Sequence, residues 1–130
     1  MHHTTTETDG ADLCAVKFTR PDVVERIRAR LETPRLRLRI SAMFKLLSDP
    51  ARLKIITALE EGELCVCEIA AIVQLSQSSV SHHLRSLREL NLVRVRRQGK
   101  MVFYVLADVH ISALVAIARD HARETLNTNV

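Results

Sequence analysis

The fold is decided by residues 63–90, which run ELCVCEIAAIVQLSQSSVSHHLRSLREL. The apolar stretch at residues 69–73 predicts a short helix, and the polar stretch at residues 76–79 predicts a break after it. A second helix is predicted over residues 77–90. Two helices joined by a short turn, the second polar on its outer face, form the helix-turn-helix pattern, whose second helix enters a DNA groove.

The second helix has one apolar and one polar face. At 100° per residue, Val80, Leu84 and Leu87 fall on one stripe and are predicted to face inward. His83 lies beside that stripe and is predicted to be packed and hydrogen-bonded rather than to contact a base. The predicted DNA contacts lie on this helix or on the basic segment after it: Gln77, Ser78, Ser79, Ser81, His82, Arg85, Arg97 and Lys100.

A basic hairpin is predicted directly after this helix. Residues 93–97 and 101–106 are rich in β-forming side chains and flank Gln98-Gly99-Lys100, where glycine supplies a positive φ. Residues 76–101 contain six Lys and Arg against Glu89 alone, whereas the whole chain has a net charge of only +4. This concentration of charge predicts phosphate binding, with the hairpin as a wing; a solvated basic face is the alternative.

Four further helices are predicted around this segment. They cover residues 21–32, 35–47, a stretch that begins after the Asp49 cap and ends at Gly62, and 108–126 with Asp108 as its cap. The helix at 35–47 is predicted to bury an apolar stripe consisting of Leu36, Ile40, Met43, Phe44 and Leu47. The arginines flanking the break between the first two helices either touch the DNA backbone or form a solvated surface.

The predicted fold class is mostly α with a β-hairpin wing, a winged helix-turn-helix that forms a homodimer. Residues 1–20 are predicted to be a mobile N-terminal arm, and residues 21–130 the winged domain with dimerising N- and C-terminal helices. At 130 residues the chain is one domain. No run of 18 apolar residues or signal-peptide core is present, which predicts a cytoplasmic protein without a membrane partner whose cysteines stay reduced.

The last predicted helix carries a candidate metal site. His110, His121 and Glu124 share one stripe, but the two histidines are eleven residues apart, about 16 Å along the axis. One chain cannot bring both to one ion, because zinc–nitrogen bonds are about 2.1 Å long. Two antiparallel copies can, with Asp108 and His110 of one meeting His121 and Glu124 of the other. The alternative is a capping aspartate and surface histidines on a dimer helix.

A second candidate metal site is built on sulfur. Cys65 and Cys67 open a helix and can chelate a soft ion, but two thiolates leave its coordination incomplete. The remaining ligands are predicted on the arm: Cys14, with Asp12, His2 or His3 as a fourth. Three thiolates favour cadmium, lead, zinc or copper(I). A buried structural pair, a redox dithiol and an arsenite trap are the alternatives.

Several motifs in order along the chain resemble one known family. The segments ELCVCE, SSVSHHLRSLREL, RRQGKMVFYVL and DVH, followed by His121 and Glu124, are similar to the ArsR/SmtB metal-sensing winged-helix repressors over residues 42–124. The resemblance implies a homodimer that represses metal-efflux or sequestration genes and releases its operator when metal binds. It implies a thiolate site at the cysteines and a zinc site at Asp108, His110, His121 and Glu124. The arm departs from the cadmium-sensing type, since Cys14 stands alone where two cysteines are common.

The predicted function is therefore a repressor that binds an inverted-repeat operator and releases it on binding zinc, cadmium or lead. The alternatives are an arsenite or thiol-redox sensor that uses Cys65 and Cys67 only, and a winged-helix module that binds proteins. An enzyme is not predicted, because four ligands on packed helices leave no open position on a metal, and no Gly-rich phosphate loop is present. No small organic substrate is expected.

Overall fold

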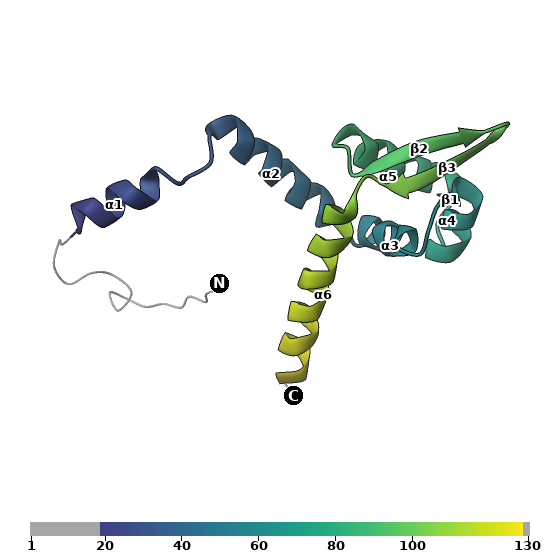
Figure 1. Cartoon of the computed structure of the whole chain (residues 1–130). Coiled ribbons are helices and arrows are strands. Elements are labelled where there is room, and N and C mark those ends of the chain that lie inside the picture. Colours follow the sequence, from purple (N-terminus) through teal and green to yellow (C-terminus); the bar gives the residue numbers. More distant parts are fainter. Residues whose placement is uncertain (1–18, 129–130) are drawn as a thin grey trace. The chain divides into compact units, whose positions relative to one another are not determined.

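The computed structural model describes residues 19–128, which divide after Arg37 into two compact units. Helix α1 and the first turn of α2 form one unit, and the rest of the chain forms the other. The predicted ligands on the arm lie outside the described residues. The elements are α1 (Pro21–Arg28), α2 (Pro34–Leu47), α3 (Pro50–Leu59), β1 (Leu64–Cys65), α4 (Val66–Val73), α5 (Gln77–Glu89), β2 (Val93–Gln98), β3 (Met101–Leu106) and α6 (Val109–Thr128) (Figure 1).

Helix α1 is shorter than the sequence predicted, because it ends at Arg28 rather than near residue 32. The backbone winds more tightly after this point. The backbone N–H of Arg30 donates to the carbonyl of Ile27 at 2.9 Å, and that of Leu31 donates to the carbonyl of Arg28 at 3.2 Å. Hydrogen bonds that span three residues are typical of the last turn of a helix. The helical spacing of apolar residues continues to Leu31, so the spacing predicted that a helix is present but not where it ends.

Helix α2 begins one residue earlier than predicted, at Pro34. The hydroxyl oxygen of Thr33 accepts the backbone N–H of Leu36 at 3.2 Å, which caps the first turn. The predicted burial of the apolar stripe is wrong for two of its five members in the single chain, and Ile40 and Met43 are half-buried. Leu47 is buried, but 48% of Leu36 and 53% of Phe44 are exposed. A helix stripe is buried only where another element covers it, and the described residues leave these two side chains uncovered.

Helix α3 begins at the predicted cap. A carboxylate oxygen of Asp49 accepts the backbone N–H of Ala51 at 2.7 Å and that of Arg52 at 3.3 Å, and Pro50 occupies the first helical position. Partial loss of hydration raises the pKa of Asp49, but these two N–H groups, together with the nearby His83 and Arg52 side chains, outweigh it and hold the pKa below its ordinary value. The ionised carboxylate is therefore the form that stabilises the start of α3.

Replacing Asp49 with alanine should lower the melting temperature at pH 7 by a few degrees, since the first turn of α3 loses its acceptor. The folded-state pKa of Asp49 is depressed, so its contribution is present above the unfolded-state value of about 3.9 and is lost as the pH falls through the folded-state value. Thermal melts of both proteins between pH 7 and pH 3 should therefore converge at the acid end. A gap that stays constant with pH would contradict this account of the cap.

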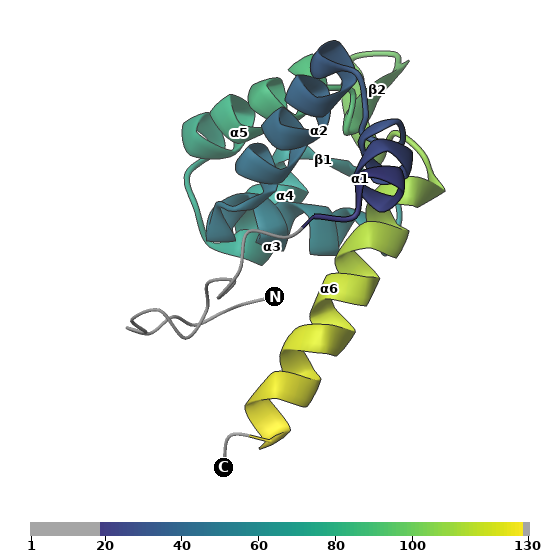
Figure 2. The ribbon, with the colours of Figure 1, turned by 90° about the vertical axis from the view of Figure 1, so that its left-hand side faces the viewer.

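The helix-turn-helix is formed by α4, a short turn and α5, and α3 packs against both. Gln74 ends α4 in the left-handed conformation, with φ of 60°. The Ser76 hydroxyl then accepts the backbone N–H of Ser79 at 3.1 Å and begins α5. Figure 2 shows α3, α4 and α5 gathered together, with α6 extending away from them. The three helices share one core, whose fully buried side chains include Ile55, Ile56, Ile69, Val80, Leu84 and Leu87.

The sheet has three antiparallel strands in the order β1-β3-β2, and the strands β2 and β3 form the predicted wing (Figure 1). Gly99 turns the hairpin with φ of +61°. One face of the sheet packs on the core through side chains such as Val93 and Tyr104. Because side chains alternate between faces along a strand, Cys65, Arg96 and Phe103 lie on the opposite face.

Helix α6 packs on the core only over its first half. Ile111 and Val115 are buried, whereas 69% of Ile117 and 71% of Leu126 are exposed. The ion pair between Arg119 and Glu60, 2.9 Å long, ties the middle of the helix to the end of α3. No helix between residues 19 and 128 is both long and apolar enough to cross a membrane.

Candidate functional site

Helix α5 exposes the polar face that the sequence predicted. Gln77, Ser78, His82 and Arg85 are exposed, whereas Ser79 and Ser81, which were also predicted to contact DNA, are half-buried. Ser79 is held partly by the cap at the start of the helix. The exposed members can therefore reach a partner without any change in the core.

His83 is a packed residue, as predicted. The guanidinium Nε of Arg52 donates to its Nδ1 at 3.2 Å, and a second nitrogen of Arg52 donates to the carbonyl of Leu46 at 3.3 Å. Arg52 thus links the end of α2, the start of α3 and the middle of α5. The sequence did not reveal this contact, because the two side chains are 31 residues apart.

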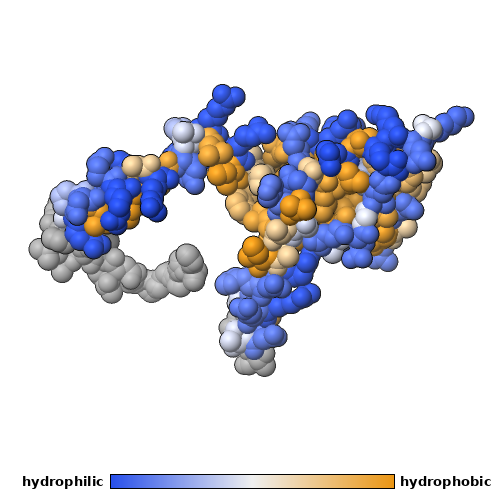
Figure 3. All heavy atoms as spheres, viewed as in Figure 1, coloured by the Kyte–Doolittle hydropathy of each residue, from blue (hydrophilic) through white to orange (hydrophobic). Residues whose placement is uncertain are grey.

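The wing presents cations of two kinds. Arg94, Arg97 and Lys100 are exposed, and the described residues give them no ion pair. Arg96 instead donates from Nε to a carboxylate oxygen of Glu63 at 2.8 Å. That hydrogen bond lowers the pKa of Glu63 against the effect of its lost hydration, and raises the pKa of Arg96. The tip of the wing is hydrophilic (Figure 3).

The two described cysteines lie at the junction of β1 and α4, and neither forms a disulfide. Cys65 is the last residue of β1 and the N-cap of α4, and it is half-buried, whereas Cys67 is exposed in the first helical turn. The backbone N–H of Cys65 donates to the Glu68 carboxylate at 3.0 Å. Cys67 is thus open to solvent and Cys65 partly so, both on regular backbone at the junction of the strand and the helix.

The candidate ligands of α6 are also at the surface. A carboxylate oxygen of Asp108 accepts the backbone N–H of His110 at 2.9 Å and lies 3.3 Å from Nδ1 of its ring. The His110 side chain is 84% exposed. His121 and Glu124 are exposed further along the helix, beyond Ile117. The lower part of α6 is largely hydrophilic (Figure 3).

Within residues 19–128 no three side chains among His, Cys, Asp and Glu lie close enough to hold a metal ion. Oxygen and nitrogen donors on α6 suit zinc, and the two thiols suit a softer ion. Each set has two neighbouring donors and needs more. A complete metal site at either set would therefore need donors from a second chain or from residues outside the described range.

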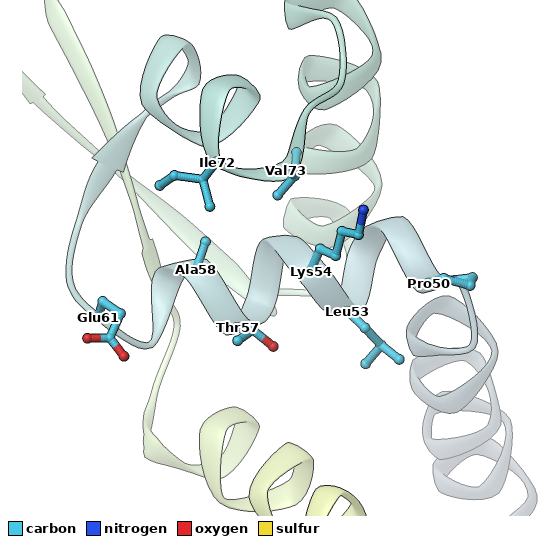
Figure 4. A pocket seen from close by; sticks show the side chains of 8 residues that line it. All are labelled: Pro50, Leu53, Lys54, Thr57, Ala58, Glu61, Ile72 and Val73. Atoms are coloured by element: carbon cyan, nitrogen blue, oxygen red, sulfur yellow. The ribbon is translucent and has the colours of Figure 1, made fainter.

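A groove between α3 and α4 contains none of these ligands. It encloses about 650 Å³ and is lined by Leu53, Lys54, Thr57, Ala58, Ile72 and neighbouring side chains. Figure 4 shows Ile72 and Val73 directed toward α3 across the groove. Its largely apolar lining lacks the histidine and cysteine donors that a metal site would need.

Residues 49–95 match the family described as bacterial regulatory protein, arsR family. The chain is 41% identical over 116 residues to a cadmium resistance transcriptional regulatory protein CadC homolog of Staphylococcus aureus, covering 87% of this chain and 93% of the relative. The chain belongs to the arsR family. It is also 46% identical over 81 residues to the arsenical resistance operon repressor of Escherichia coli, which covers 62% of this chain and 68% of that repressor.

The solved structures agree with this family. A homodimeric winged helix-turn-helix DNA-binding domain of Mycobacterium bovis superposes with a TM-score of 0.66 at 28% identity, covering 72% of this chain and 90% of that domain. The predicted family and winged helix-turn-helix fold are confirmed. As an ArsR-family protein, the chain is a DNA-binding transcriptional regulator, and α5 occupies the place of its recognition helix.

Replacing Arg85 with alanine should weaken binding to a specific DNA site by about 1–3 kcal/mol and relax the preference among sequences, because the exposed face of α5 points this cation outward. Arg88→Ala is the matched control, an exposed arginine one turn further along the same helix, and it should weaken all sequences alike. Fluorescence anisotropy with specific and scrambled duplexes measures both effects. Equal losses on both duplexes for Arg85→Ala would contradict a base contact.

Proposed function

We propose that this ArsR-family regulator is a homodimeric repressor that holds an inverted-repeat operator in its metal-free form. It releases the operator when zinc, cadmium or lead binds, and so derepresses genes for metal efflux or sequestration. The observation that carries the proposal is the pairing of an exposed recognition helix with two surface sets of metal donors, each incomplete within residues 19–128. The name of the staphylococcal relative, a cadmium resistance regulator, supports a metal effector.

A dimer supplies the geometry that the proposal needs. Two recognition helices one DNA turn apart (~34 Å) fit successive major grooves of an inverted repeat. The uncovered apolar side chains on α2 and α6, among them Phe44 and Ile117, support dimer contacts through these helices, and the homodimeric mycobacterial domain supports the same assembly. Asp108 and His110 of one chain would then complete a zinc site with His121 and Glu124 of the second.

The thiolate set would be completed from the arm. Cys65 and Cys67 would bind the softer ions with Cys14, and Asp12, His2 or His3 would supply a fourth donor. An arm held against the start of α4 restricts where the wing and α5 can sit. Metal binding would thus favour a subunit arrangement that fits the operator poorly, at a coupling free energy of a few kcal/mol.

Reciprocal titration tests this function. Because coupling acts in both directions, operator DNA must weaken metal binding by the factor by which metal weakens DNA binding. Zinc and cadmium affinities are measured by competition with a chelator, with and without operator, on the full chain and on His121→Ala. If the chain bound zinc with the same affinity with and without operator, and likewise cadmium, the proposal would be contradicted.

An arsenite or thiol-redox sensor is the second candidate, favoured by the two unpaired thiols one residue apart and by the arsenical resistance repressor among the relatives. It requires only Cys65 and Cys67. Arsenite or a mild oxidant would then release the operator, and His121→Ala would behave as the unmodified chain. Release of the operator by zinc but not by arsenite would favour the metal-responsive repressor over the thiol sensor.

A further inference from the structure

The outer face of the small sheet carries a row of side chains that connects the cysteine segment to the wing. Cys65 on β1 is paired with Phe103 on β3, and Phe103 is paired with Arg96 on β2. Directly paired residues in antiparallel strands have Cβ atoms about 4.5–5.5 Å apart on the same face. The row therefore runs across all three strands, at right angles to the chain.

Arg96 closes this row with contacts from each of its guanidinium nitrogens. Nε and Nη2 donate to the two carboxylate oxygens of Glu63, the former at 2.8 Å, and Nη1 donates to Gln98 at 2.9 Å. The guanidinium carbon also lies 5.0 Å from the centre of the Phe103 ring. Two parallel hydrogen bonds to one carboxylate fix both the position and the orientation of an arginine.

The place of Glu63 makes this contact more than a surface ion pair. Glu63 lies two residues before Cys65, and β1 contributes only two residues to the sheet, Leu64 and Cys65. An edge strand this short has few ladder hydrogen bonds to hold it. The Glu63–Arg96 pair spans from the start of β1 to the far strand β2, so it adds a fixed point on the other side of β3.

We infer that Glu63 and Arg96 form a brace that positions the wing against the cysteine segment, so that Arg96 acts on DNA binding by placing the wing and not by contacting phosphate. The inference rests on the proposed function where it concerns the metal: a ligand at Cys65 that moves β1 would move the wing through the same brace. The neighbouring Arg97, exposed and without an ion pair among the described residues, remains a phosphate contact.

The test compares three variants of the full chain: Arg96→Gln, Glu63→Gln and, as the matched control, Arg97→Gln. Amide hydrogen exchange is measured first, without DNA or metal. Arg96→Gln and Glu63→Gln should speed exchange in β1 and the facing part of β3 by about two- to fivefold, the range of a partly exposed ion pair. Arg97→Gln should leave that exchange unchanged. Unchanged exchange in both brace variants would overturn the inference, whatever the protein does with DNA.

DNA binding supplies the second readout, at several salt concentrations. Arg97→Gln should reduce the dependence of log affinity on log salt by about one ion, as loss of one phosphate contact does. Arg96→Gln should lower affinity with the salt dependence retained. Glu63→Gln is the sharpest variant, since removing a negative charge strengthens DNA binding by simple electrostatics, whereas loss of the brace weakens it. Stronger binding by Glu63→Gln, or a reduced salt dependence for Arg96→Gln, would overturn the inference.

The metal readout separates the brace from the proposed function. Cadmium affinity of the DNA-free chain should be the same in Arg96→Gln as in the unmodified chain, whereas the factor by which cadmium weakens operator binding should fall. If the unmodified chain shows no such factor, the proposed function fails while the exchange result still decides on the brace. If cadmium weakened operator binding by Arg96→Gln as much as it does for the unmodified chain, coupling through the brace would be contradicted.

Discussion

Replacing Leu84 with alanine should lower the free energy of unfolding by about 2–5 kcal/mol. Leu84 is completely buried on the inner side of α5, where it belongs to the same core as Ile55 and Ile69. Truncation removes three carbon atoms from this core and leaves a cavity that the surrounding helices fill only in part. Since domains of this size are stable by about 5–15 kcal/mol, the loss is a large fraction of the total.

Urea denaturation at one fixed chain concentration measures this loss, because a dimer makes apparent stability depend on concentration. Met101→Ala is the control: Met101 is also apolar and follows α5 in the chain, but it is half-exposed at the start of β3. It should change stability by no more than about 0.5 kcal/mol. A loss below 1 kcal/mol for Leu84→Ala would show that α5 is not held by the core around Leu84.

The recognition helix was predictable because its signals are local. Val80, Leu84 and Leu87 recur at helical spacing, and Asp49 in front of Pro50 marks the start of α3 by an equally local signal. Gly99 marks the wing for the same reason. The burial of α2 was not predictable, because periodicity shows which face is apolar and not what covers it. Phe44 belongs to the stripe and is nevertheless exposed within the described unit.

The sequence predicted which residues form the candidate sites, but not the hydrogen bonds that hold the surrounding elements in place. The donors on α6 and the two cysteines stand out as residue types at recognisable spacing. The contacts that position the functional elements do not stand out in the sequence. Arg52 is hydrogen-bonded to His83, and Arg96 to Glu63, across more than 30 residues of chain. A charge count placed Arg96 with the phosphate-binding cations. Only the hydrogen bonds of its guanidinium to Glu63 and Gln98 in the folded chain show that this cation is already engaged.

Replacing Cys65 with serine should abolish the response at the cadmium and lead concentrations that release the operator from the unmodified chain, while leaving DNA binding by the metal-free chain intact. The position tolerates serine, because Cys65 is half-buried and is the N-cap of α4, where serine is among the preferred residues. The backbone pairing with Phe103 does not depend on the side chain. What is lost is the proposed sulfur ligand, and a hydroxyl is a poor ligand for these soft ions.

The size of the effect follows from the ligand count. Even partners outside the coordination sphere contribute 10- to 100-fold to metal affinity, so losing one of the three proposed thiolate ligands should raise the cadmium concentration for half-release of the operator by at least about 100-fold. Zinc titration of the same variant is the control, since Asp108 and His110 on α6 are untouched. A variant that binds operator much more weakly without metal would show that Cys65 holds the fold of β1 and α4, and one that still releases operator at the original cadmium concentration would remove the cysteines from the sensing site.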